Sequence, residues 1–311
     1  MFEMQITHDK YSNCAQDVFL NILQYGKFNA NLLLSTGWLF YYNRVNTDIF
    51  FGDAINIYSN EFFEVENALI RYYGIRINHI AKKDYKTVIY DDKKRKLPIC
   101  IYMDSYYCPW QSGYGKLHNN HLIILLEVNK DNCICADPYV NKHRVSLSVP
   151  ALIKGLVYLV ELIDGGEDNI KSFDYVLNDS INNMKFNHVV ENIKRFSKDI
   201  IEHMDKFNAE MDSAEIAFIP IVRKMMYISY GRMSYYSFLK SGSIDFVQKY
   251  ENDIKEFETL AKKWSLVCSK LIRYGMVEEK VPLLMQISDL LFAIAEEEEK
   301  ISNRLLIISR K

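Results

Sequence analysis

The sequence lacks several patterns that mark common protein classes. It contains neither the P-loop pattern nor the glycine-rich fingerprint of dinucleotide-binding proteins, so nucleotide chemistry has no support. No apolar run approaches the roughly 18 residues that a membrane helix needs. The first residues lack the basic start and the apolar stretch of a signal peptide. We therefore expect a soluble cytoplasmic protein that has no membrane partner.

Neither sign of charge dominates the chain, and cysteine is not enriched. The 311 residues carry a formal net charge of −2, with a pI of about 6.4, which gives no electrostatic reason to expect nucleic acid as a partner. The six cysteines suggest no disulfide framework. Cys133 and Cys135 would face the same way on a strand, but no second cysteine pair completes a zinc site. We expect no bound metal.

The patterns that are present divide the chain into two halves. Residues 1–163 mix helical and strand patterns, whereas strand signals become sparse after the segment 164–168, which contains two glycines. We therefore predict an α+β fold, with an N-terminal domain over 1–163 and an all-α domain over 169–311. The long helical patterns of the second half cover residues 187–210, 213–240, 243–274 and 280–308.

The first half contains both helix and strand predictions. Apolar spacing predicts helices over 17–23 and 61–73. Runs of β-branched and aromatic residues predict four strands, the last two of which are joined by the turn-forming residues 129–132 into a hairpin. The predicted strands are 87–90, 97–103, 121–128 and 133–136.

Cys14 stands where a helix is predicted to begin, with Ser12 or Asn13 as its cap. A helix N-terminus stabilises the thiolate, the reactive form of cysteine, through unpaired backbone N–H groups and the helix dipole. Taken alone, such a residue is more often a small buried apolar group than a nucleophile. Two downstream residues change this balance.

His121 and Asp137 are the predicted base and its orienting acid. His121 opens an apolar strand and Asp137 ends the next one, so a hairpin brings them near each other. The register decides whether they meet. An even-length loop that pairs Val128 with Cys133 puts them on opposite faces, whereas a five-residue loop or a bulge puts them on the same face. The less favoured substitutes for the acid are Glu127 and Asp104.

Several segments resemble one known family over roughly residues 10–140. These segments are 13–14, 34–40, 101–109, 118–121 and 136–138. In order and spacing they resemble the family named after the butirosin-biosynthesis protein H, an acyltransferase branch of the papain-like cysteine-peptidase fold. The residues from 170 onward, especially 230–239, look like the helical domain that often follows it. The resemblance implies a papain-like domain with a central antiparallel sheet and a helix-borne Cys.

What the resemblance implies is acyl transfer. The family's namesake moves an aminoacyl chain from an acyl carrier protein thioester to an amine of an aminoglycoside. By that likeness Cys14 would be the nucleophile, His121 the base and Asp137 the orienting acid. The expected partners are an acyl or peptidyl carrier protein, whose phosphopantetheine arm donates the acyl group, and a small amine acceptor in antibiotic or other specialised-metabolite biosynthesis. No bound cofactor is expected. A cysteine hydrolase with the same triad and a non-catalytic carrier-binding protein are the alternatives.

Substrate-binding and oxyanion residues can also be named. In related peptidases a Gln shortly before the Cys helps form the oxyanion hole, and here His8 stands six residues before Cys14. The expected oxyanion donors are the backbone N–H of Cys14, Asn13 and His8. Of the family's glycine-rich stretch this chain keeps Gly37. The resemblance implies that Asp104, Tyr106 and Tyr107 lie on the pocket wall, and Trp110 extends this aromatic segment, whose residues also fit plain packing.

The role of the helical half stays open at this level. Its amphipathic stripes establish that it packs against something, whether an acceptor pocket, a homodimer interface or a docking face for a carrier protein. No helix carries a clear basic face for an acidic carrier. The acidic run 296–299 is interpreted as a solvated face.

Overall fold

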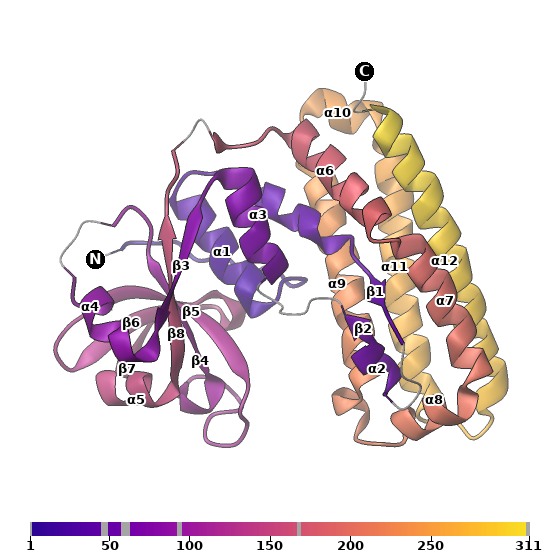
Figure 1. The fold of residues 1–311 in the computed structure, drawn as a ribbon, viewed down its shortest axis with the longest axis horizontal. Helices are drawn as coiled ribbons and strands as arrows, with labels where there is room; N and C mark the ends of the chain where they lie inside the picture. The colour runs from indigo at the N-terminus through magenta and orange to yellow at the C-terminus, as the bar shows by residue number, and fades with distance from the viewer. Residues whose placement is uncertain (1, 45–48, 57–62, 92–94, 167–168, 309–311) are drawn as a thin grey trace. The chain divides into compact units, whose positions relative to one another are not determined.

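The computed structural model describes residues 2–44, 49–56, 63–91, 95–166 and 169–308 (Figure 1). Its contacts divide the chain into two compact units. One consists of the residues up to Leu33 together with Glu61–Lys171, and the other of Leu34–Asn60 together with Ser172–Lys311. The first unit is built around an antiparallel sheet and the second is largely helical, which confirms the predicted α+β class.

A six-stranded antiparallel sheet forms the centre of the first unit. Its central strands are the most apolar, because both of their faces are covered. The sequence predicted three of the strands in approximately their observed positions. In spatial order the strands are β3 (Arg76–Ala81), β8 (Leu156–Ile163), β4 (Ile99–Asp104), β5 (Asn120–Val128), β6 (Asn132–Asp137) and β7 (Lys142–Ser148).

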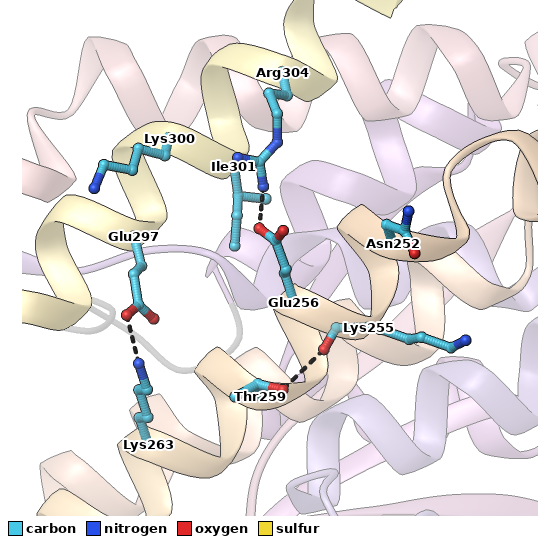
Figure 2. Close-up of a pocket in the computed structure, with 9 residues that line it drawn as sticks. All are labelled: Asn252, Lys255, Glu256, Thr259, Lys263, Glu297, Lys300, Ile301 and Arg304. Carbon is cyan, nitrogen blue, oxygen red and sulfur yellow. Dashed lines mark hydrogen bonds and ion pairs between the residues drawn. The ribbon is translucent and has the colours of Figure 1, made fainter.

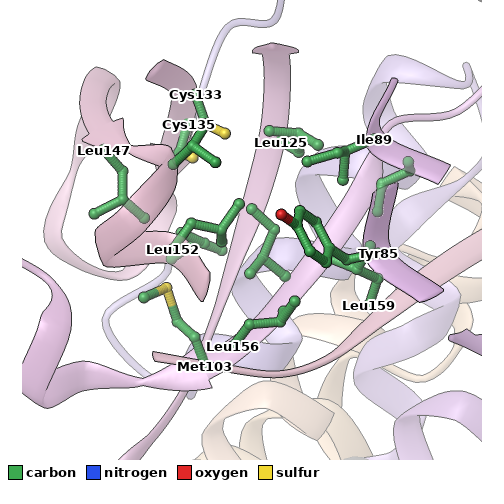
Figure 3. Close-up of a cluster of buried hydrophobic side chains, with 14 of the residues drawn as sticks. Tyr85, Ile89, Met103, Leu125, Cys133, Cys135, Leu147, Leu152, Leu156 and Leu159 are labelled. Atoms are coloured by element: carbon green, nitrogen blue, oxygen red, sulfur yellow. The ribbon is translucent and has the colours of Figure 1, made fainter. Parts of the chain in front are cut away.

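Two short helices, α4 (Tyr85–Ile89) and α5 (Val149–Gly155), pack into a hydrophobic core with one face of this sheet. The prediction of a strand over 87–90 is wrong, because this stretch is helical through Ile89. Tyr85 and Ile89 are one helical turn apart, and both side chains are buried in the core (Figure 3). Burial of this pair outweighs the strand preference of the β-branched run between them.

The helix that carries Cys14 is α1 (Cys14–Tyr25). Asn13 caps it: its side chain accepts a hydrogen bond from the Gln16 N–H at 2.9 Å, and the Gln16 side chain accepts one from the Asn13 N–H at 3.2 Å. The helix contacts β5 and the 3₁₀ helix Pro138–Val140. The other helix predicted in this region, 61–73, corresponds to α3 (Phe63–Tyr73), and its first two residues lie outside the described part.

The helical patterns of the second unit were predicted correctly in type but not in number. The predicted helix 187–210 is two helices separated at His203, and 243–274 is two helices separated at Tyr250. The predicted helix 213–240 begins only at Pro220, a residue suited to a first helical turn. The observed helices are α6 (Phe173–Phe186), α7 (Val189–Glu202), α8 (Met204–Met211), α9 (Pro220–Lys240), α10 (Ile244–Lys249), α11 (Glu251–Tyr274) and α12 (Lys280–Ile308).

Residues 34–60 were predicted within the N-terminal domain, but the structure groups them with these helices. The segment contains a short helix, α2 (Phe51–Ala54), and a two-stranded ribbon of β1 (Tyr41–Tyr42) and β2 (Ile55–Asn56). Trp38 is fully buried against Tyr235, with ring centroids 4.8 Å apart. Aromatic burial of this kind attaches the segment to the helical unit rather than to the sheet.

A buried ion pair lies at the centre of the helical unit. Arg232 and Glu298 are both fully buried, and the guanidinium Nε lies 3.0 Å from Glu298 Oε1. Trp38 and Trp264 each donate an indole N–H to Glu298 at 2.9 Å. The interpretation of the acidic run 296–299 as a solvated face is therefore wrong for Glu298. A helical run of four acids spans all sides of the helix, and this one faces inward.

Gly37 and Gly231 mark a close crossing of backbones within the same unit. A Cβ atom on Gly37 would overlap the carbonyl oxygen of Gly231, and a Cβ on Gly231 would lie 2.7 Å from the carbonyl oxygen of Gly37. Gly37 is therefore needed for packing against α9. Among the described residues, no helix is both long enough and apolar enough to cross a membrane.

Candidate active site

Cys14, His121 and Asp137 come together in the first unit. His121 Nε2 lies 2.7 Å from Asp137 Oδ2, and both side chains are buried. The His121 ring also has a hydrogen bond with the Cys14 side chain. Because the carboxylate accepts the Nε2 proton, Nδ1 is the ring nitrogen left for the thiol. A thiol, an imidazole and a carboxylate in this order can generate a nucleophilic thiolate.

The register of the β5–β6 hairpin explains how the base and the acid meet. Near the turn, Val128 pairs with Cys133, the register that by itself would put the two residues on opposite faces. A bulge between Leu125 and Glu127 then shifts the pairing by one residue, so that Leu125 pairs with Cys135. Beyond the bulge, Asp137 therefore lies on the same face as His121.

The surroundings of His121 favour its charged form. Burial opposes the charge, but the hydrogen bonds and negative charge of Asp137 and Cys14 outweigh it and raise the His121 pKa to about 10. At neutral pH the ring is therefore an imidazolium. Cys14 therefore stands at the start of α1 with an imidazolium beside it, the two surroundings that are typical of nucleophilic cysteines.

Two neighbouring donors hold Asp137 in place. Trp110 donates its indole N–H to Asp137 Oδ2 at 2.7 Å, and Gln111 donates its amide N–H to the same oxygen at 2.8 Å. Trp110 was predicted on the pocket wall, and the structure gives it this bond to the acid. Gln111 was not predicted, because nothing in its local sequence marks it. These contacts fix the carboxylate that orients His121.

Three residues predicted on the substrate wall, Asp104, Tyr106 and Tyr107, form a separate cluster at the end of β4. Asp104 Oδ2 lies 2.5 Å from Nδ1 of His118, whose ring stacks on Tyr106 with centroids 4.4 Å apart. Partial burial opposes the charge of Asp104, but hydrogen bonds from His118 and backbone N–H groups lower its pKa. Tyr107 contacts Tyr106 edge-on. Asp104 is thus paired with His118 and does not replace Asp137.

The predicted oxyanion residues have defined neighbours. The Asn13 side-chain oxygen caps α1, so only its amide nitrogen is left for another bond. His8 Nδ1 lies 2.6 Å from Oδ2 of Asp17, a buried residue in the first turn of α1. This His8–Asp17 pair was not predicted. The sequence does contain one indication of it, because Asp17 is an acidic residue only three positions after Cys14. The helix prediction for 17–23 used Asp17 only as the first residue of its range.

The remaining cysteines contrast with Cys14. Cys14 is partly exposed, whereas the other five are buried. Burial raises the thiol pKa of Cys108 to about 12 and that of Cys133 to about 11, and it raises the pKa of Cys100, Cys135 and Cys268 as well. Within the described ranges, no three His, Cys, Asp or Glu side chains are grouped so that they could hold a metal ion.

A cavity of about 540 Å³ lies elsewhere, on the helical unit between α11 and α12, and none of the predicted site residues lines it (Figure 2). Lys263 and Glu297 form an ion pair across it at 2.5 Å, and Arg304 bonds Glu256. Most of the charged side chains that line this cavity pair with one another, as is typical of a solvent-exposed surface between two helices.

Comparison of the chain with protein-family models and with curated proteins finds no match. The likeness to the butirosin-biosynthesis protein H family therefore stays a prediction made from short segments. The functional assignment of Cys14, His121 and Asp137 rests on their geometry.

Proposed function

We propose that the protein is a cysteine acyltransferase, which moves an acyl or aminoacyl group from the thioester of an acyl or peptidyl carrier protein to a small amine. The observation that carries this proposal is the arrangement of Cys14 at a capped helix start, hydrogen bonded to His121, which Asp137 orients. The family resemblance directs the proposal to thioesters and amines rather than to peptides.

The geometry supports a two-step reaction. The Cys14 thiolate attacks the thioester carbonyl, and His121 gives its proton to the departing pantetheine thiol, which leaves an acyl-Cys14. The amine then attacks this carbonyl, His121 takes a proton from the attacking nitrogen, and Cys14 leaves as thiolate. One thioester replaces another in the first step, so acyl-enzyme formation has little thermodynamic cost.

The same three residues would equally serve a hydrolase, in which water replaces the amine. Two features favour transfer once an acyl group is bound: His121 has 5 % of its surface exposed and Asp137 has none. A buried base limits the access of water, and aminolysis depends on such exclusion. The two reactions differ in product, since one gives an amide and the other a free acid.

The test is acylation of the purified protein with acyl-pantetheine, followed by mass spectrometry. We expect one acyl group on Cys14, its transfer to an added primary amine, and no acylation of Cys14→Ala. Cys268→Ala is the matched control, because that thiol is buried in α11 and should leave acylation unchanged. Acyl transfer by Cys14→Ala would overturn the proposal. Release of free acid despite saturating amine would identify a hydrolase instead.

A further inference from the structure

A second histidine–carboxylate pair lies next to the first. His8 Nδ1 is 2.6 Å from Asp17 Oδ2. Asp17 is only 1 % exposed and belongs to the first turn of the helix that begins at Cys14, whereas the His8 side chain is 34 % exposed. The chain thus places a partly accessible imidazole against the nucleophile's own helix, where the buried carboxylate of Asp17 holds it.

Several hydrogen bonds hold His8 in this position although its segment has no regular secondary structure. Asn21, one turn further along α1, accepts the Thr7 N–H and donates to the Thr7 carbonyl, both at 2.8 Å. The Asp9 N–H donates to the second oxygen of Asp17 at 3.2 Å. The residues on both sides of His8 are therefore fixed to α1, which limits the positions its ring can take.

The two imidazoles present different nitrogen atoms. His121 gives Nε2–H to Asp137 and has Nδ1 left for Cys14. In His8 the bond to Asp17 uses Nδ1, so Nε2 is the remaining nitrogen, and within the described part of the chain no group bonds to it. A carboxylate that accepts Nδ1–H leaves the Nε2 lone pair ready to accept a proton.

Tyr139 connects the two pairs. Its ring meets the His8 ring edge-on at a centroid distance of 5.7 Å and the His121 ring at 6.3 Å. It belongs to the 3₁₀ helix that follows Asp137 and is partly exposed. His8 is therefore one aromatic ring away from the catalytic base.

If the proposed acyl transfer to an amine holds, the number of protons that the amine must lose requires a second base, which the His8–Asp17 pair can supply. After acylation His121 is neutral and can take one proton. A primary amine with a pKa near 10 reaches the site as an ammonium ion at neutral pH and must lose one proton before it can attack and another as the amide forms. One base accounts for only one of these protons.

We propose that His8, oriented by Asp17, is the base that deprotonates the ammonium group of the acceptor. His8 Nε2 takes one proton from R–NH₃⁺ to give R–NH₂. The amine then forms the C–N bond, its second proton passes to His121, and the C–S bond to Cys14 breaks. The products are the amide and the thiolate–imidazolium pair, and protonated His8 returns its proton to solvent.

The charges near His8 suit this role. Asp17 from α1 bonds to His8, Tyr139 from the 3₁₀ helix meets its ring, and His121 lies beyond Tyr139. The neighbours of His8 in the sequence, Asp9 and Lys10, add one charge of each sign. Burial raises the Asp17 pKa, although the bonds from His8 and Asp9 oppose this shift. Within the described part of the chain, neither Lys nor Arg bonds to the pair.

The test separates the two half-reactions in His8→Gln and Asp17→Asn, with acyl-pantetheine as donor. At pH 7 we expect aminolysis of acyl-Cys14 by n-propylamine to fall by about 10²–10⁴-fold in His8→Gln, far more than acylation does. The loss should diminish as the pH approaches the pKa of the amine. It should be absent with hydroxylamine, which is largely neutral at pH 7. Asp17→Asn should show the same pattern with a smaller loss.

His79→Gln is the matched control, since His79 pairs with Glu66 at 3.1 Å on the same unit and, among the described residues, has no bond to a residue of the site. It should change neither half-reaction. Equal losses in acylation and aminolysis would make His8 an oxyanion donor and overturn the proposal, as would an equal loss with hydroxylamine or no loss at all. If the unmodified protein forms no acyl-Cys14, the proposed function itself fails, and this inference fails with it.

Discussion

His121 Nε2 and Asp137 Oδ2 lie 2.7 Å apart because β5 contains a bulge between them and the hairpin turn. Without that extra residue the acid would face the opposite side of the sheet. The bulge is thus the local feature that places the acid beside the base, and it lies next to the site, as bulges often do.

The bond to Asp137 controls the protonation of His121. In Asp137→Asn the amide keeps the shape of the carboxylate but removes the negative charge that stabilises the imidazolium. We expect the His121 pKa to fall from about 10 by about 1–3 units. The imidazolium would then be lost at lower pH, so the alkaline limit of acylation should move to lower pH as well. An NMR titration of the His121 ring measures the shift directly.

The remaining histidines serve as internal controls in that titration. His118 and His79 have carboxylate partners of their own, so the substitution of Asp137 should leave their ring signals as they are in the unmodified protein. A His121 midpoint that stays near its original value in Asp137→Asn would show that Asp137 does not set its charge.

The reactive cysteine can be identified without knowledge of the substrate. A mild alkylating agent near neutral pH should modify one of the six cysteines in the native protein, namely Cys14, because the others are buried. Burial raises their thiol pKa values in addition. Mass spectrometry of the labelled protein counts the modified residues, and denatured protein should take up six labels.

Two substitutions check that assignment. Cys14→Ser should remove native labelling, whereas Cys268→Ser should leave it intact. Labelling that persists in Cys14→Ser, or slow labelling of Cys14 comparable to that of the buried thiols, would mean that the helix start and His121 do not activate it.

The sequence was sufficient to name the three residues of this candidate site but not the neighbours that each of them contacts. Cys14, His121 and Asp137 could be proposed from the sequence because a helix cap and the two ends of continuous apolar strands are local patterns. The bulge was one of several open alternatives, since a single extra residue leaves no clear signature in the hairpin. Gln111 and the His8–Asp17 pair were missed because each depends on where a side chain from another segment arrives in space.

The division into units shows the same limit. Residues 34–60 have the apolar and aromatic content of a core segment, but composition does not reveal which core they join. In the structure they belong to the helical unit, where Trp38 donates a hydrogen bond to Glu298, which is 260 residues away in the sequence. The apolar periodicity was sufficient to predict that these segments are helical. It did not predict where each helix begins and ends, because that depends on single residues such as Pro220.

The buried pair of Arg232 and Glu298 should be essential for stability. In Glu298→Gln the guanidinium stays buried without a counter-charge, so we expect a loss of about 3–5 kcal/mol in the free energy of unfolding. Glu297→Gln is the matched control, because its ion pair with Lys263 is partly exposed and should contribute about 1 kcal/mol or less. Denaturant unfolding followed by tryptophan fluorescence reports on this region, since Trp38 and Trp264 both bond Glu298. Similar losses in the two variants would contradict the special role of the buried pair.

The crossing of Gly37 and Gly231 predicts a second stability effect that no side-chain contact explains. In Gly37→Ala the new methyl group would overlap the backbone oxygen of Gly231, which cannot rotate away as a side chain would. We expect a loss of about 1–3 kcal/mol, because α9 and the segment must separate to admit the methyl group. Gly113→Ala is the control: there the new Cβ would approach nothing closer than the Leu117 side chain, at 3.4 Å, and should change stability little. Thermal unfolding of both variants measures the difference, and equal melting temperatures would show that the helical unit accommodates the methyl group without cost.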